Sequence, residues 1–173
     1  MYLDSRGFVT IGMGHLIADM TGARKLEFRT AKSLPASAAD IKVDYDSVKK
    51  LPPNRPASFY KIHTNLIILN VEIDKLTNQH IVSFEKELRI IYAGFDGFPT
   101  EVKLALFDLI FNLGATRLSL RWPTFNAAIK VKDWQKSADN SGRAPPVSAE
   151  RNKYVKDLLE KGANPAHSQH LKL

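Results

Sequence analysis

The sequence predicts an α+β fold: mainly helical, with a small N-terminal β-hairpin lobe, a helical lobe and a cleft between the two lobes. Residues 2–17 alternate short β-favouring pairs with glycine-rich turns. From about residue 76 onward, apolar residues recur at helical spacing. Residues 18–75 lack a sustained period of either kind, because prolines interrupt them (Pro35, Pro52, Pro53 and Pro56).

The N-terminal stretch predicts three short strands, at Tyr2–Leu3, Val9–Thr10 and Leu16–Ile17. A four-residue turn (residues 4–7) and two closely spaced glycines separate these strands. The stretch is therefore expected to form a hairpin whose turns let a bulky substrate approach the backbone.

The middle region, residues 18–75, is expected to be an irregular segment with short helices, such as one over residues 41–51. Residues 60–73 are apolar and β-branched, which fits either a strand or a loop packed on the core.

Three long helices are predicted for the helical lobe, residues 76–163. Thr77 is a suitable N-cap for the first, and Ser148 for the last, which is expected to end at Gly162. The helix between Thr100 and Gly114 is apolar nearly all round, which is typical of a central helix. Residues 1–163 are thus expected to form one domain, followed by a flexible tail at residues 164–173.

Composition excludes several classes of protein and leaves others open. The 173 residues contain no cysteine, so disulfides and thiolate metal sites are excluded. No apolar run approaches the length of a membrane span, and no signal peptide is recognisable. The net charge of +7 favours anionic partners such as nucleic acid, an anionic membrane or the bacterial wall, although a well-solvated basic surface explains it equally well. No nucleic-acid-binding motif of known spacing is present, so no nucleic acid partner is expected.

Three polar residues of the hairpin are candidates for chemistry: Asp4, Thr10 and His15. Each also has a purely structural interpretation, since an Asp in a turn ordinarily caps its own backbone and Thr is common in strands. No second His or carboxylate lies at metal-ligand spacing from His15, so neither a metal nor another cofactor is expected.

Taken together, the hairpin residues resemble the active-site hairpin of the phage-type lysozymes. Tyr2-Leu-Asp-Ser-Arg-Gly-Phe-Val-Thr-Ile-Gly-Met-Gly-His15 matches nearly every fixed position of that segment, Tyr-x-Asp-x-x-Gly-x-x-Thr-Ile-Gly-x-Gly-His. Phe111-Asn-Leu-Gly114 is similar to the motif that ends the family's central helix. The middle region resembles the longer inter-lobe regions of bacteriocin-like and secreted-effector lysozyme domains, and about two-thirds of the chain shares the resemblance.

The resemblance implies a glycoside hydrolase that cleaves the β-1,4 link between N-acetylmuramic acid and N-acetylglucosamine in bacterial peptidoglycan. Asp4 would be the ionised carboxylate that stabilises the transition state or positions the attacking water, and Thr10 would hold that water. His15 would support the base of the hairpin. Asn112 would line the substrate site, and Arg151 would hold the general acid in place. The protein would act on the cell wall, in the periplasm or outside the cell, as an antibacterial effector, with an immunity protein as a further candidate partner.

One part of the family's site is missing from the sequence. The general acid is a Glu followed by Gly, nine residues before the hairpin Asp, and no Glu precedes Asp4. Three explanations stay open: an upstream segment or domain supplies the Glu, the chain binds peptidoglycan without cleaving it, or another Glu has taken over. The first is the leading hypothesis. The alternative function is a non-catalytic peptidoglycan-binding module or an inactive truncated lysozyme-like domain, and a basic nucleic-acid-binding domain is a more distant third.

Overall fold

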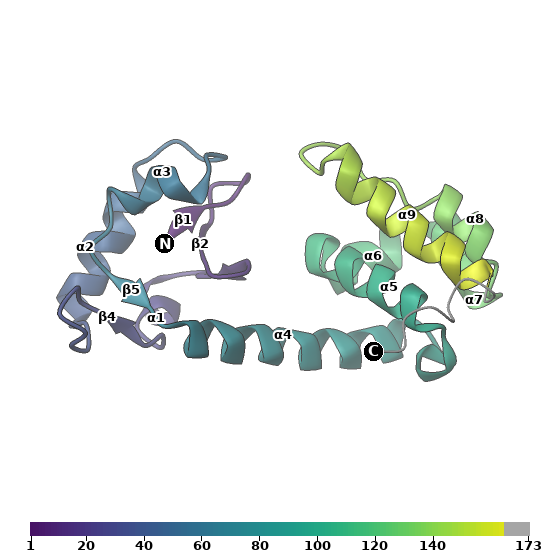
Figure 1. Ribbon diagram of the computed structural model, residues 1–173, viewed down its shortest axis with the longest axis horizontal. Helices are drawn as coiled ribbons and strands as arrows, with labels where there is room; N and C mark the ends of the chain where they lie inside the picture. The colour runs from purple at the N-terminus through teal and green to yellow at the C-terminus, as the bar shows by residue number, and fades with distance from the viewer. Residues whose placement is uncertain (165–173) are drawn as a thin grey trace. The chain divides into compact units, whose positions relative to one another are not determined.

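The computed structural model describes residues 1–164, so the predicted tail lies outside the described residues except for Asn164. The chain divides into two compact units, one over Met1–Gln79 and one from His80 onward. The boundary falls inside a long helix, α4 (Asn70–Ile91), which contributes residues to both units (Figure 1). Each unit is described by itself below.

The first unit contains two small antiparallel sheets and three short helices. The sheet β1-β2-β3 is formed by the predicted hairpin, and the second sheet pairs β4 with β5. The bounds are β1 (Tyr2–Leu3), β2 (Val9–Ile11), β3 (His15–Leu16), α1 (Met20–Ala23), β4 (Phe28–Arg29), α2 (Ala38–Lys49), α3 (Ala57–Lys61) and β5 (Ile67–Ile68).

A buried cluster of apolar side chains holds the first unit together, and it includes Leu3, Val9 and Ile11 from the hairpin. A buried carboxylate adds a polar anchor, because Asp44 of α2 accepts hydrogen bonds from the backbone N–H groups of Asn65 (2.9 Å) and Leu66 (2.8 Å). This satisfies the buried charge and fixes the segment that leads into β5.

The second unit is helical. Its core helix α5 packs against α9, which also packs against α8 (Figure 1). The bounds are η1, a 3₁₀ helix (Phe95–Gly97), α5 (Thr100–Leu113), α6 (Ala115–Arg121), α7 (Pro123–Lys130), α8 (Trp134–Asp139) and α9 (Ala149–Ala163).

The predicted α+β class is confirmed, since 59% of the structure is helical and the rest includes two small sheets. The predicted start of α5 at Thr100, its stop at Gly114 and the cap at Ser148 are also confirmed. The stop and the cap are both local signals. Gly114 adopts φ +75°, and the Ser148 side chain accepts a hydrogen bond from the N–H of Arg151.

The predicted beginning of α4 was wrong. The helix begins at Asn70, and the Thr77 hydroxyl donates to the carbonyl of Ile73 (2.8 Å) inside the helix instead of capping its end. The apolar, β-branched run that precedes Thr77 obscured the helical period, although part of that run, Ile67–Ile68, is a strand.

The predicted end of α9 at Gly162 was also wrong, since the helix continues to Ala163. Gly162 of α9 is buried against α5, where a Cβ would overlap with Cγ2 of Val102. The glycine therefore permits close packing of two helices and does not terminate one.

Replacing Gly162 by alanine should lower the free energy of unfolding by about 1–3 kcal/mol, because overpacking outweighs the better helix propensity of alanine. Urea denaturation measures the loss. Gly97→Ala is the matched control, because nothing lies within 4 Å of a Cβ placed there. A Gly162→Ala protein as stable as Gly97→Ala would contradict this packing argument.

No helix in the described part of the chain has both the length and the apolar character that crossing a membrane requires.

Candidate functional site

The hairpin of the first unit forms a regular antiparallel sheet. Tyr2 pairs with Thr10 and Leu3 with Val9, while Ile11 pairs with His15 across the second turn. All three residues of β2 are buried, so this central strand is covered on both faces.

Three glycines of this hairpin adopt positive φ. Gly7 has φ +78° in the first turn, and Gly12 and Gly14 have φ +53° and +102° in the second. A Cβ on Gly12 would also come within 2.9 Å of Cγ2 of Ile73. Positive φ strongly favours glycine, and the close approach at Gly12 leaves no room for a Cβ, which explains the glycine-rich character of the motif.

Asp4 follows β1 and begins the first turn. Its Oδ1 accepts hydrogen bonds from the N–H groups of Arg6 and Phe8, both at 2.9 Å. Its Oδ2 lies 3.9 Å from Nε of Arg6, and 28% of the side chain is exposed. The carboxylate is therefore held in one orientation by the turn that it caps, with its second oxygen bound only weakly.

Neighbouring contacts brace this turn. The Asp4 carbonyl accepts from the N–H of Gly7 (3.0 Å), and the Gly7 carbonyl accepts from Nζ of Lys49 in α2 (3.2 Å). Burial, and then the charge of Asp4, raise the pKa of the Tyr2 hydroxyl above its usual value. The Tyr2 hydroxyl is therefore kept in its neutral form, and it lies close enough to Asp4 to interact with the carboxylate charge.

Thr10 lies in the middle of β2 and is buried, with 4% of its surface exposed. Its hydroxyl donates to the carbonyl of Phe8 (3.1 Å). The hydroxyl oxygen keeps its two lone pairs, which can accept hydrogen bonds.

His15 begins β3 and is half-buried opposite Ile11. Asp4, Thr10 and His15 thus come from three successive parts of one sheet, as the sequence predicts.

The other two candidate residues belong to the second unit. Asn112 lies in the last turn of α5 and is exposed. Arg151 lies in the first turn of α9, and its guanidinium carbon is 5.7 Å from the centre of the Phe111 ring. Arg151 thus lies over the ring of Phe111, a residue that is itself 42% exposed.

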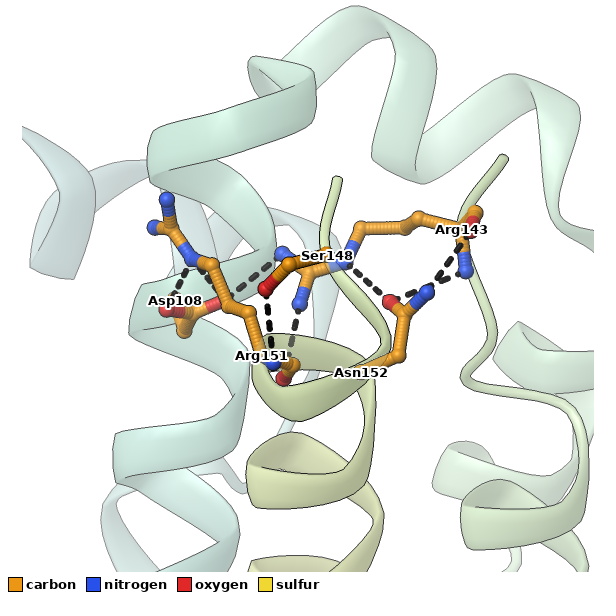
Figure 2. A network of polar contacts seen from close by, with 5 residues as sticks. All are labelled: Asp108, Arg143, Ser148, Arg151 and Asn152. Atoms are coloured by element: carbon orange, nitrogen blue, oxygen red, sulfur yellow. Dashed lines mark hydrogen bonds and ion pairs between the residues drawn. The ribbon is translucent and has the colours of Figure 1, made fainter. Parts of the chain in front are cut away.

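Asp108 of α5 is the partner of Arg151, and the sequence did not single it out. Nε of Arg151 lies 2.9 Å from Oδ2 of Asp108, and Nη1 of Arg143 lies 2.6 Å from Oδ1 (Figure 2). Arg143 also donates from Nε to Oδ1 of Asn152 (3.1 Å) and from Nη2 to the Arg151 carbonyl (3.3 Å). One carboxylate therefore aligns two arginines.

Arg143 and Arg151 differ in exposure and in the number of N–H donors that remain unused. The Arg143 side chain is 2% exposed, and its donors are used by the three groups around it. The Arg151 side chain is 39% exposed, and within residues 1–164 its Nη1 and Nη2 form no hydrogen bond. Arg151 is therefore oriented by its Nε and keeps the N–H donors of its two outer nitrogens for an anion.

In the sequence, the cluster of Asp108, Arg143 and Arg151 is visible only as three isolated charged residues. Asp108 is separated from Arg143 by 35 positions and from Arg151 by 43. No local pattern links residues so far apart, and only the packing of α9 on α5 brings them together.

Within residues 1–164, no three His, Asp or Glu side chains gather where they could hold a metal ion. No family model, no curated protein and no solved structure matches this chain. Any functional conclusion therefore depends on the residues themselves and on their geometry.

Proposed function

We propose that this chain is a lysozyme-like domain that cleaves peptidoglycan at the β-1,4 link between N-acetylmuramic acid and N-acetylglucosamine. The single observation that supports the proposal most strongly is the hairpin. Its fourteen-residue motif forms a three-stranded sheet with a partly exposed, backbone-oriented carboxylate at Asp4.

In this proposal Asp4 is the ionised carboxylate of the site. Glycoside hydrolysis passes through an oxocarbenium-like transition state, which a fixed negative charge stabilises. Two backbone hydrogen bonds hold Oδ1 of Asp4, so Oδ2 is the oxygen that faces the developing charge or the attacking water. Thr10 accepts a hydrogen bond from that water, while His15 supports the sheet.

The proton donor comes from outside the 173 residues in this proposal. Asp108 is a poor candidate for the donor, because two guanidinium groups occupy its oxygens. Arg151 is suited to receive the carboxyl group of an upstream Glu, since its two outer nitrogens are unused within the described residues. Leu104 and Phe111, seven residues apart on α5, are 48% and 42% exposed and would be covered by the helix that carries this Glu.

The proposal is tested by measuring reducing sugars released from purified cell walls. Protein that includes the upstream helix should release them continuously, whereas residues 1–173 alone should bind without turnover. Binding without turnover by the longer protein would instead support the alternative, a peptidoglycan-binding module. Absence of both binding and turnover would reject both functions.

A further inference from the structure

A shallow groove of the second unit is lined by two arginines that form no ion pair with any residue the structure describes. The groove has a volume of about 570 Å³ and is lined by Leu113, Gly114, Ala115, Thr116, Arg117 and Arg121. Arg117 and Arg121 are four residues apart on α6, so they project from the same face of the helix. Both residues are exposed.

The lack of ion pairs at these two arginines is unusual for this unit. Arg89, Arg143 and Arg151 each contact a carboxylate, at 2.9 Å or less. In residues 1–164 no carboxylate lies within ion-pair distance of Arg117 or Arg121. The sequence itself explains this in part, because no Asp or Glu occurs between Asp108 and Asp133.

Arg117 does not stabilise the helix α6, so helix stability does not explain its presence. A cation in the first turn of a helix is disfavoured by the helix dipole, and two like charges four residues apart repel each other. Both unfavourable terms are removed when an anion binds between the guanidinium groups. Arginine is also the side chain whose planar donors match a carboxylate, with two parallel hydrogen bonds.

The backbone of the groove is open to a ligand. Gly114 adopts φ +75°, and nothing lies within 4 Å of a Cβ placed there. Thr116, which is exposed beside it, offers a hydroxyl. The groove begins one residue after Asn112, which the family resemblance assigns to the substrate site.

We infer that Arg117 and Arg121 form a subsite for the carboxylates of the peptide stems that branch from the glycan strands of peptidoglycan. The inference rests on the proposed function. It adds recognition of the peptide stems to the proposed cleavage of the glycan strand. The arginine pair binds the acidic stem while the neighbouring surface at Asn112 contacts the glycan.

The test measures sedimentation of the full chain with insoluble peptidoglycan, before and after enzymatic removal of the peptide stems. The double variant Arg117→Gln/Arg121→Gln should bind intact peptidoglycan about tenfold more weakly, the effect expected when charge-assisted hydrogen bonds are lost. On stripped glycan, variant and wild type should bind equally. The control Lys130→Gln/Lys132→Gln removes the same charge from exposed residues outside the groove and should bind intact peptidoglycan within about twofold of wild type.

Four results would overturn the inference: no binding by the wild type, an equal loss in the lysine control, an equal loss on stripped glycan, or no loss at all. Duplex DNA and phosphatidylglycerol vesicles are included at the same salt, and arginine-dependent binding to either that matches binding to peptidoglycan would overturn it as well. The assay does not depend on turnover. If the arginine-dependent binding is seen but the longer protein releases no sugar, the muramidase proposal fails and the subsite stands.

Discussion

Replacing Asp4 by asparagine should lower the rate of peptidoglycan hydrolysis by at least about a hundredfold in protein that carries the upstream helix. Asparagine keeps a carbonyl oxygen that can accept from the N–H groups of Arg6 and Phe8, so the turn should persist. It lacks the negative charge that stabilises an oxocarbenium-like transition state. The rate of release of reducing sugars measures the effect, and thermal unfolding checks that the fold is retained.

Asp19→Asn is the matched control for this experiment. Asp19 also lies in the first unit and accepts a hydrogen bond from a backbone N–H, that of Gly22 at 2.7 Å, but it has no place in the proposed site. It should retain full activity. Full activity of Asp4→Asn would contradict the assignment of Asp4. Equal losses in both variants would show that the loss does not depend on the charge of Asp4 in particular, and would contradict the assignment as well.

Replacing Asp108 by asparagine should produce the largest loss of stability, on the order of 3–5 kcal/mol. The side chains of Arg143 and Asp108 are 2% and 17% exposed, so the substitution leaves a buried guanidinium without its counter-ion. It also removes the partner that orients Arg151. Urea denaturation followed by circular dichroism gives the change in the free energy of unfolding.

Asp157→Asn serves as the control for Asp108. Asp157 pairs with Lys153 one turn away on α9, where both side chains are well exposed, so its stability should stay near that of the wild type. If Asp108→Asn lowers the free energy of unfolding no more than Asp157→Asn does, the Asp108 cluster stabilises the fold no more than an exposed ion pair.

The hairpin and the cap at Ser148 could be predicted because their causes lie within a few residues. Gly7 and Gly12 have positive φ, Asp4 binds the backbone two and four residues later, and Ser148 caps the helix that begins beside it. Each of these features is written in a short stretch of sequence.

The features that could not be predicted depend on packing between distant segments. Gly162 was interpreted as a helix stop because local sequence does not show that it packs against Val102, which lies 60 positions away. Asp44 holds Asn65 and Leu66 across more than twenty residues, and Asp108 meets its two arginines across still longer separations. For the same reason the groove at Arg117 and Arg121 is recognised only in the structure, where none of the carboxylates in residues 1–164 lies close to either arginine.

The most direct test of the muramidase proposal is the identity of the sugar at the new reducing end. Peptidoglycan is digested with protein that includes the upstream helix, the products are reduced with borohydride, and the resulting sugar alcohols are identified by mass spectrometry. The proposal predicts the alcohol of N-acetylmuramic acid, absent from a digest with Asp4→Asn. The alcohol of N-acetylglucosamine as the main product, or no new reducing end at all, would contradict it.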